Sequence, residues 1–232
     1  MFGKHEGRHV ERDIFLPDEG HVLFSCDLSQ VDMRGIAGHC QDPAYMALFE
    51  PGQDAHEQIA AMLGITRQQA KKAGHGWNYG LGERKMIEEW GMDPDVVHRF
   101  TNGMEARFPR LMSWREEIRA RAQAGEILGN GFGRRMSAAP ERAHTVGPAL
   151  LGQGTAGDIM KEVLLRLDER APELRPYYRV MVHDEQVFSA PEEDVEEIIA
   201  TVREAFTWEW HGVKILCDVN GPGRTWGEIS AK

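Results

Sequence analysis

The sequence is poor in cysteine, and it has neither a long apolar run nor a low-complexity tract. Cys26, Cys40 and Cys217 are odd in number and lack C-x-x-C spacing, which excludes the usual zinc and redox motifs and predicts reduced, mostly buried thiols. No window approaches the roughly 18 to 20 apolar residues of a membrane span, and the first residues lack the apolar core of a secretory signal. We therefore expect an intracellular, cytoplasmic chain with no membrane partner.

Basic residues are outnumbered by acidic ones, but they are unevenly placed. The formal charge of −10 argues at first against nucleic acid, because phosphate contacts need Lys and Arg. Residues 1–63 carry four basic and eleven acidic groups, residues 64–136 carry thirteen and nine, and residues 158–232 carry nine and sixteen. A basic middle between acidic flanks suits a protein whose middle holds phosphates while its flanks hold divalent cations. Solvated helix faces without function explain the same distribution.

The first part of the chain predicts one buried strand followed by helices. The apolar run HVLFSCDL, residues 21–28, reads as a strand with Asp27 at its carboxyl end. Two glycines lie within the helix predicted over 67–79, each at a cost of about 1 kcal/mol relative to alanine, so either something approaches that backbone closely or the helix is loosened. The predicted helices span 31–40, 42–50, 54–64, 67–79, 83–90, 93–107 and 109–124, before a Gly-rich hairpin over 127–136.

The last third of the chain mixes helices and strands. We predict a helix over 153–170, a hairpin within RVMVHDEQVFSA, a helix over 192–208 and a strand over 213–219. Val182 and Val187 anchor the two sides of the acidic turn, which places Asp184 at the hairpin tip. The predicted architecture is α+β, with a basic helical middle inserted between two sheet-forming ends.

Two carboxylates stand at the ends of predicted strands, Asp27 and Asp184. Either alone is typical of a cap or a turn. Together they have the arrangement that holds two Mg²⁺ ions side by side, because hard divalent cations prefer carboxylate oxygens. In phosphoryl transfer, two such ions about 3.5 to 4 Å apart activate the attacking oxygen and stabilise the leaving one. The pair therefore predicts two Mg²⁺ ions, for which Mn²⁺ is a candidate substitute.

A cationic stripe runs along the helix predicted over 67–79. Arg67, Lys71 and His75 recur at every fourth residue, so they share one helix face, and Tyr79 follows one turn later. Arg67 and Lys71 are suited to a triphosphate, while the two rings are suited to stacking on a base or sugar. An exposed basic face without function has the same pattern.

Five ordered segments resemble motifs of the family A DNA polymerases. DLSQVDMR (27–34) resembles motif A, RQQAKKAGHGWNYG (67–80) resembles motif B, and VHDE (182–185) resembles motif C. QGTAGDIMK (153–161) resembles the family's Q-G-T-A-A-D-I-x-K helix, and GFGRRM (131–136) its G-R-R segment. The resemblance covers the chain from about residue 10 to residue 228. Within the family, the sequence is most similar in character to bacteriophage enzymes. A bacteriophage origin would place the chain in the host cell cytoplasm.

The resemblance implies a role for each matching residue. Asp27 and Asp184 would bind the metals, the Leu28 carbonyl would be a further ligand, and Glu185 would support catalysis at this site. Arg67 and Lys71 would grip the incoming dNTP, with Lys71 as proton donor to pyrophosphate. The remaining implied contacts are a nucleotide pocket made by His75, Tyr79, Gln30 and Asp32, and primer–template DNA contacts made by His183, Gln153 and Arg134.

The same resemblance implies a domain layout. Residues 1–50 and 140–232 would form the palm, and residues 51–139 would form the fingers. Motif A begins only 27 residues into the chain, so we expect that the thumb and the exonuclease are absent. Because phosphate contacts along the duplex dominate affinity, the chain would then need a separate polypeptide or a missing domain to grip DNA.

Two positions depart from the family pattern, and three other readings stay open. Asp32 stands where the family has a glutamate that blocks a ribose 2′-hydroxyl, and His75 stands where the family has Phe or Tyr.

One alternative is a catalytically weak DNA-binding or scaffold subunit of a replication complex. A nuclease or other two-metal phosphotransferase is another, and an enzyme that copies or makes RNA is the third.

Overall fold

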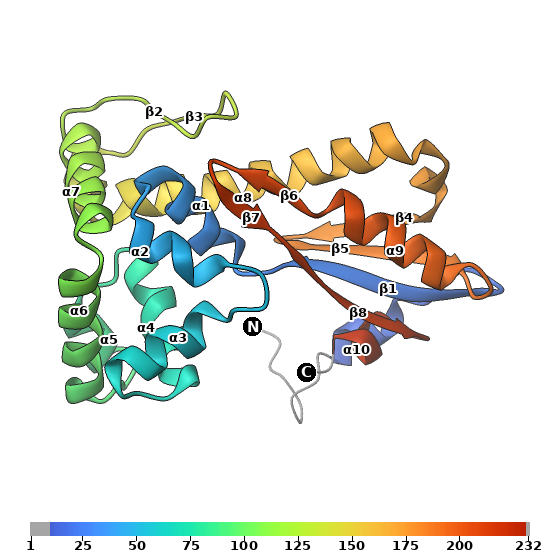
Figure 1. Cartoon of the computed structure of the whole chain (residues 1–232), viewed down its shortest axis with the longest axis horizontal. Coiled ribbons are helices and arrows are strands. Elements are labelled where there is room, and N and C mark those ends of the chain that lie inside the picture. The colour runs from blue at the N-terminus through green and yellow to red at the C-terminus, as the bar shows by residue number, and fades with distance from the viewer. Residues whose placement is uncertain (1–9, 231–232) are drawn as a thin grey trace. The chain divides into compact units, whose positions relative to one another are not determined.

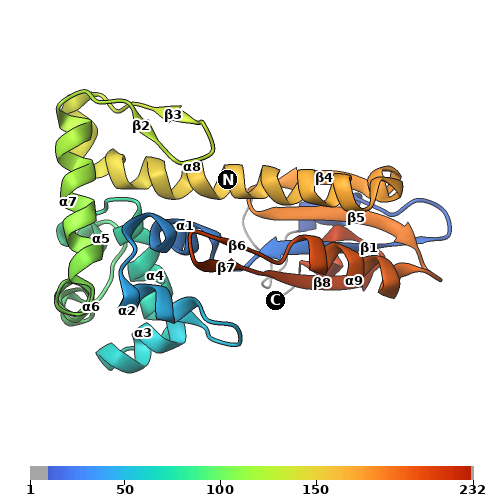
Figure 2. The same ribbon diagram turned by 45° about the horizontal axis from the view of Figure 1, so that its top comes forward.

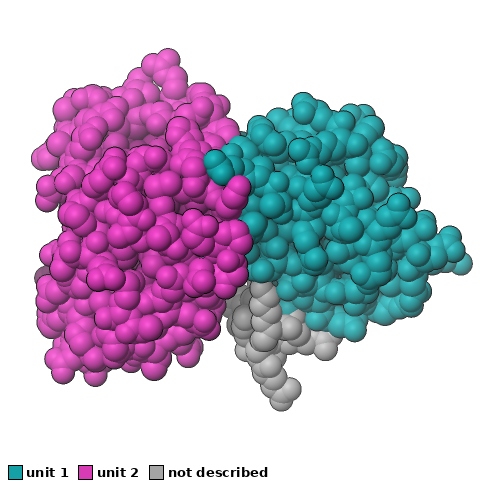
Figure 3. All heavy atoms as spheres, in the orientation of Figure 1, with its two compact units in different colours: residues 1–31, 157–209, 215–232 teal, residues 32–156, 210–214 magenta. Residues whose placement is uncertain are grey.

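The computed structural model describes residues 10–230, which form two compact units (Figure 3). Unit 1 contains residues 10–31, 157–209 and 215–230, and unit 2 contains residues 32–156 and 210–214. Unit 1 is built on an antiparallel sheet and unit 2 is mainly helical. The predicted α+β class is confirmed.

Unit 1 has a four-stranded antiparallel sheet with the order β4-β5-β1-β8 (Figure 1). The strands are β1 (His21–Leu28), β4 (Tyr178–Val182), β5 (Glu185–Pro191) and β8 (Cys217–Gly223). The interior of β1, residues 22–26, is entirely buried, as expected for a central strand covered on both faces. Phe24 lies opposite Phe188, and the two rings stack with centroids 4.8 Å apart. The strand predicted over 21–28 is confirmed with the same bounds.

Strands β4 and β5 form the predicted hairpin. Val182 pairs with Glu185, so the turn consists of His183 and Asp184. His183 has a φ of +56°, the left-handed conformation that tight two-residue hairpin turns require. The prediction that Asp184 lies at a hairpin tip is confirmed.

Short helical segments from both ends of the described chain pack together in unit 1. The 3-10 helix η1 (Val10–Ile14) packs against α10 (Trp226–Ile229), which also contacts β1 and β8. Helix α9 (Val195–Ala205) packs against β1, β5 and β8 (Figure 2). The 3-10 helix η4 (Pro172–Tyr177) precedes β4.

Side chains define the start of several helices in unit 2. Asp42, Asp54, Thr66 and Asp93 each accept hydrogen bonds from backbone N–H groups of the following first turn, which would otherwise lack partners. The helical elements are α1 (Val31–Cys40), α2 (Pro43–Met46), η2 (Ala47–Phe49), α3 (Ala55–Leu63), α4 (Arg67–Asn78), α5 (Glu83–Glu88), α6 (Pro94–Arg107), α7 (Pro109–Gln123), η3 (Pro140–Arg142) and the first part of α8 (Ala143–Arg170).

A large aromatic core holds these helices together. Tyr45 is fully buried, and its ring meets those of Phe49 and Phe108 edge-on, with centroids 5.3 and 5.2 Å apart. Trp77 of α4 meets Phe100 of α6 in the same way at 6.3 Å. Helix α4 is therefore anchored by its buried face, which leaves its polar face open.

The short strands lie outside the large sheet. Strands β2 (Leu128–Gly129) and β3 (Arg135–Met136) form the predicted Gly-rich hairpin, and β6 (Trp208–Trp210) pairs with β7 (Val213–Ile215). The strand predicted over 213–219 is thus two strands, because residues 213–215 pair with β6 and residues 217–223 pair with β1.

Helix α8 begins at Ala143, ten residues before the predicted start at 153. Glycine and proline near its start have poor helix propensity, but tertiary packing overrides that preference. A Cβ at Gly147 would lie 3.3 Å from Ala122, and one at Gly152 would lie 3.3 Å from Ile36, so a side chain at either position would crowd the neighbouring helix.

The cysteines and the hydropathy of the helices agree with what the composition predicts. The three cysteines are unpaired; Cys26 and Cys40 are buried and Cys217 is half-buried. Within residues 10–230, no helix combines the length and the apolar character that a membrane span requires.

Candidate active site

Three acidic residues form a row across the sheet of unit 1. In the register, Asp27 of β1 lies opposite Glu185 of β5 on one side and opposite Asp218 of β8 on the other. Directly paired residues of antiparallel strands project to the same face, so these carboxylates share one face of the sheet. Asp218 was missed by the sequence analysis, because only the register of β8 places it beside Asp27.

Asp184 lies at the same end of this sheet. The backbone N–H of Leu28, the residue after Asp27, donates to the backbone carbonyl of Asp184 over 2.9 Å. Asp27 and Asp184 are distant in sequence, and this bond brings their chain segments into contact. Leu28 itself has a buried side chain, and Gln30 follows with a φ of +52° in the connection to α1.

Glu185 is held by both ends of the described chain. Arg12 Nη1 lies 3.2 Å from Oε2 of Glu185, and the indole N–H of Trp226 donates to Oε1 over 3.2 Å. The Arg12 guanidinium also stacks on Trp226, with its carbon 4.2 Å from the ring centroid. Because each carboxylate oxygen has a protein partner, Glu185 is suited to fixing the hairpin rather than to binding an ion.

The donor set fits magnesium. Within the described residues, no group of three or more His, Cys, Asp or Glu side chains is arranged to hold a metal by itself. Mg²⁺ does not need such a cage, because it is usually bound by one or two carboxylates together with substrate phosphates and water. Asp27 and Asp184, with Asp218 beside the first of them, provide oxygen donors of the kind that Mg²⁺ prefers.

In unit 2, helix α4 carries the predicted cationic stripe. Thr66 caps the helix, and the side chain of Gln69 completes a capping box by accepting from the Thr66 N–H. Arg67, Lys71 and His75 are all exposed on this helix. Gly76 packs against the ring of Trp90, so the close approach expected at this glycine is made by the protein itself.

Arg67 is engaged by acidic residues from α3. Its Nη2 lies 2.6 Å from Oδ2 of Asp54, and its Nε lies 3.8 Å from Glu57. The Arg67 side chain is 48% exposed, so solvent screens this ion pair and its contribution to stability is small. An anion with more charge than a single carboxylate could therefore displace Asp54.

His56 is a residue that the sequence analysis missed. It is 8% exposed, and its Nδ1 has no hydrogen-bond partner among residues 10–230. Burial lowers the pKa of His56, Asp54 opposes that shift, and the charges of Arg67 and Lys71 lower the pKa further. The imidazole thus lies within the electrostatic influence of both cations. The DAH sequence at the start of α3 was read only as a helix start.

The C-terminal end of α4 is tied to α1. Tyr79, the C-cap residue, donates its hydroxyl hydrogen to the carboxylate of Asp32 over 2.6 Å. The ring of His75 lies beside that of Tyr79, with centroids 4.5 Å apart. Two residues predicted for the nucleotide pocket, Tyr79 and Asp32, are therefore brought together within unit 2.

Of the residues predicted to contact DNA, Gln153 and His183 are exposed and Arg134 is half-buried. Gln153 is exposed on α8, and Arg134 lies in the loop between β2 and β3. Asn130 of that loop donates to the carbonyl of Gly154 over 3.2 Å, so the loop and this part of α8 are neighbours. His183 is exposed in the β4–β5 turn of unit 1.

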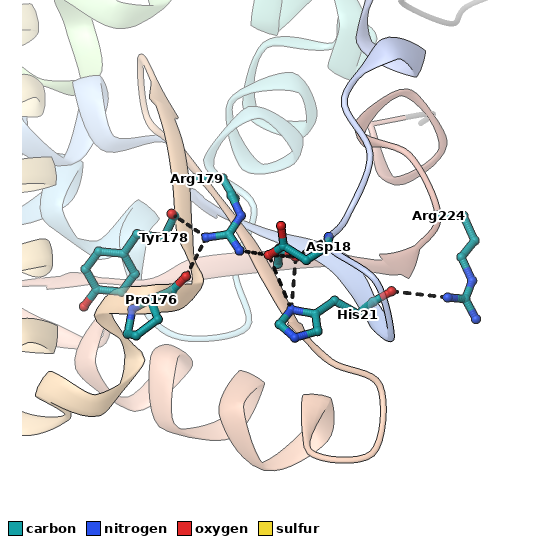
Figure 4. Close-up of polar contacts among 7 residues, drawn as sticks. Asp18, His21, Pro176, Tyr178, Arg179 and Arg224 are labelled. Carbon is teal, nitrogen blue, oxygen red and sulfur yellow. Dashed lines mark hydrogen bonds and ion pairs between the residues drawn. The ribbon is translucent and has the colours of Figure 1, made fainter.

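A second polar cluster in unit 1 includes a serine, His21 and Asp18 but lacks the geometry of a hydrolase; Figure 4 shows His21 and Asp18 facing each other. Ser189 Oγ lies 3.3 Å from Nδ1 of His21, and Asp18 approaches the same nitrogen at 3.7 Å. A catalytic triad places serine and aspartate on opposite ring nitrogens. Ser189 is also fully buried, and Arg179 pairs with Asp18. The cluster therefore links the N-terminal end of β1 to β4 and β5.

Comparisons with known proteins identify the class. The sequence model of DNA polymerase family A matches residues 2–228, so the chain belongs to this family. It is 28% identical to the thermostable DNA polymerase I of Thermus filiformis over 94% of this chain and 28% of that protein. It is also 28% identical to DNA polymerase I of Pseudomonas aeruginosa, over 85% of this chain and 24% of that protein.

A viral relative and a solved structure extend the comparison. The DNA polymerase of Mycobacterium phage L5 is 25% identical over 95% of this chain and 36% of its own length. The polymerase domain of Pol1 from M. smegmatis, solved with primer–template DNA and dNTP, has the same fold, with a TM-score of 0.79, 23% identity and coverage of 94% of this chain and 42% of that one. The chain spans less than a third of the length of the Thermus filiformis and Pseudomonas aeruginosa DNA polymerases I.

Proposed function

We propose that the chain catalyses template-directed addition of deoxynucleotides to the 3′ end of a DNA primer. The observation that carries this proposal is the meeting of two distant segments in unit 1, where the N–H of Leu28 bonds to the carbonyl of Asp184. Asp27 and Asp184 thereby lie at one end of a sheet. Membership of DNA polymerase family A supports the same reaction.

Asp27 and Asp184 would hold two Mg²⁺ ions, or Mn²⁺ in their place. When bound, such ions lower the pKa of the primer hydroxyl and neutralise charge on the leaving pyrophosphate. The Leu28 carbonyl remains a candidate ligand, and Asp218 adds negative charge beside Asp27. Glu185 would act by fixing the hairpin that carries Asp184, because Arg12 and Trp226 occupy both of its oxygens.

Arg67 and Lys71 would bind the triphosphate, with His56 as a neutral donor beside them. Entry of the triphosphate would replace the Asp54 carboxylate on Arg67, a favourable exchange because a triphosphate carries several negative charges. Lys71 would donate a proton to the pyrophosphate as it leaves. These three side chains come from two helices that follow one another in unit 2.

Tyr79, Asp32, His75 and Gln30 would test the base and sugar of the nucleotide. The hydrogen bond from Tyr79 to Asp32 fixes where both side chains lie. A carboxylate held in this way would exclude a ribose 2′-hydroxyl by occupying its space. His75 would stack beside Tyr79, as their ring distance of 4.5 Å permits.

His183, Gln153 and Arg134 would contact primer and template. We assign residues 1–50 and 140–232 to a palm and residues 51–139 to fingers, and we propose that a thumb and exonuclease are supplied by a further segment or a separate polypeptide. The match to a Mycobacterium phage polymerase supports a bacteriophage origin.

Primer extension tests this proposal. The chain is incubated with a primed DNA template, dNTPs and Mg²⁺, alone and with the candidate partner, and Asp184→Ala is the inactive control. We expect template-directed incorporation that needs Mg²⁺ and falls at least about a thousandfold in Asp184→Ala, because removing a metal carboxylate removes most transition-state stabilisation.

Other outcomes identify the alternatives. DNA binding without incorporation, under every metal and partner condition, would favour a scaffold subunit. Loss of primer that needs no dNTP would favour a nuclease. Efficient use of rNTPs or of an RNA template would favour an enzyme that makes or copies RNA.

A further inference from the structure

Unit 2 buries an arginine that the proposed chemistry does not use. Arg115 of α7 is 2% exposed, and its guanidinium carbon lies 3.7 Å from the centroid of the Trp77 ring. Its Nη2 donates to the backbone carbonyl of Trp77 over 2.9 Å. Among residues 10–230, no carboxylate pairs with Arg115, and its Nη1 has no hydrogen-bond partner. Burial of a cation without an acidic partner is costly, so packing alone would favour an apolar residue here.

The contact is directed at the last turn of α4. Carbonyl groups of a final helical turn lack intrahelical partners and carry partial negative charge. The Trp77 carbonyl accepts from the N–H of Gly80 over 3.1 Å and from Arg115 as well. A positive charge at this point therefore stabilises the turn whose C-cap residue is Tyr79.

We propose that Arg115 is a positioning residue that fixes the last turn of α4 and thereby aims Tyr79 at Asp32. This inference rests on the proposed function, in which Tyr79 and Asp32 test the nucleotide sugar. Arg115 acts from behind the helix, because it stacks on the buried indole of Trp77 while Tyr79 reaches Asp32 from the same turn.

The guanidinium stays charged in this environment. Burial and the charge of the nearby Arg119 lower the pKa of Arg115, Tyr45 opposes the shift, and the resulting pKa is about 10. Arg115 is therefore protonated at pH 7. An apolar side chain of similar length could fill the space beside Trp77, but it could not donate to the carbonyl.

The first test needs no catalysis. Hydrogen–deuterium exchange is compared in the parent, in Arg115→Met and in Arg110→Met, a matched control that alters an exposed arginine on the same helix. We expect the amides of Tyr79, Gly80 and Leu81 to exchange about tenfold faster in Arg115→Met and to stay unchanged in the control. Exchange within twofold of the parent in Arg115→Met would overturn the proposal, whether or not the chain is a polymerase.

The second test is kinetic. Single-nucleotide incorporation of dNTP and rNTP should show about tenfold weaker sugar discrimination in Arg115→Met, with KM for dNTP raised more than kcat is lowered. Arg115→Lys should recover part of both the exchange protection and the discrimination, since its ammonium group can still donate to the carbonyl. Should Arg115→Met fail to fold, the Lys variant alone decides. Its ammonium group can donate to the Trp77 carbonyl but lacks the planar group that stacks on the indole, so both its exchange protection and its discrimination should fall below parental values. Parental values for both measurements would overturn the proposal.

The two proposals fail in different ways. If the parent incorporates no nucleotide under any condition, the proposed function is wrong. The hydrogen–deuterium exchange measurement then still tests the structural role of Arg115. If Arg115→Met is active and discriminates between dNTP and rNTP as the parent does, Arg115 does not position Tyr79, and the proposed function is unaffected.

Discussion

Each unit buries a charged side chain next to candidate site residues, but the two units balance that charge differently. In unit 1, Glu185 follows Asp184, and Arg12 and Trp226 bind its two oxygens. In unit 2, Arg115 lies beneath α4 without an acidic partner among the described residues. Breaking a buried ion pair strands the remaining charge, whereas replacing an unpaired buried charge with an apolar group costs little stability. We therefore expect stability to depend on the buried charge of unit 1, and function to depend on that of unit 2.

The largest expected effect on stability is that of Arg12→Met. It leaves Glu185 buried without its cation, which should lower the free energy of unfolding by about 3 kcal/mol. Urea unfolding at pH 7 measures this loss, and adding Glu185→Gln to the variant should restore part of it. If Arg115→Met lowers the free energy of unfolding as much as Arg12→Met does, stability does not depend more on the buried charge of unit 1 than on that of unit 2.

A pH dependence sharpens the comparison, because unit 2 also contains a half-buried histidine, His39. Burial, together with the charge of His211, lowers the pKa of His39 from 6.5 to about 4. The unfolded chain therefore takes up this proton first, so the stabilisation is complete above pH 6.5 and is lost as the pH falls toward 4.

The variant His39→Gln isolates this contribution. Between pH 7 and pH 4.5, the parent should lose about 2 kcal/mol more unfolding free energy than the variant, as expected for a shift of this size in one group. Glutamine can still bond to Thr155, the partner of His39 Nε2 at 2.8 Å. Equal slopes of stability against pH in the two proteins would show that His39 is not the acid-sensitive group.

A smaller effect is expected at the surface ion pair between Arg67 and Asp54. Asn at position 54 can still cap α3, but it no longer competes with phosphate for Arg67. We expect Asp54→Asn to lower KM for dNTP by up to about fivefold, with kcat unchanged. A factor of that size corresponds to the free energy of an exposed ion pair, at most about 1 kcal/mol. An increase in KM would mean that Asp54 orients Arg67 for binding rather than masking it.

The smallest expected effect concerns the length of the carboxylate at position 32. Asp32→Glu should improve discrimination against rNTPs by about threefold, because the longer side chain approaches the 2′-hydroxyl more closely. Single-nucleotide incorporation with matched dNTP and rNTP measures the ratio. Equal ratios in parent and variant would indicate that the bond to Tyr79, rather than side-chain length, sets the exclusion.

The sequence was most informative where a pattern is local. The apolar run of β1, the cationic stripe of α4 and the acidic turn at Asp184 each depend on neighbouring residues, and the structure has all three where they were predicted. The early start of α8 was missed because glycines disfavour a helix locally, whereas in the fold they give neighbouring helices room to pack closely.

Features of the candidate site that depend on tertiary pairing could not be predicted. Asp218 is beside Asp27 only through the register of β8, and the clamp on Glu185 joins residues more than forty positions apart. His56 needed the placement of α3 beside α4 before its proximity to Arg67 and Lys71 could be recognised. The charge of Arg115 was counted as part of the basic middle, although its side chain is buried.

The most direct test of the account asks whether Asp27 and Asp184 act as one unit. Single-nucleotide incorporation is measured for Asp27→Asn, Asp184→Asn and the double variant under saturating Mg²⁺. Residues that serve the same ions are strongly non-additive, so the double variant should be about as slow as the slower single variant. If the two losses multiply, or if either variant keeps the parental rate, the two carboxylates do not share the metal site proposed here.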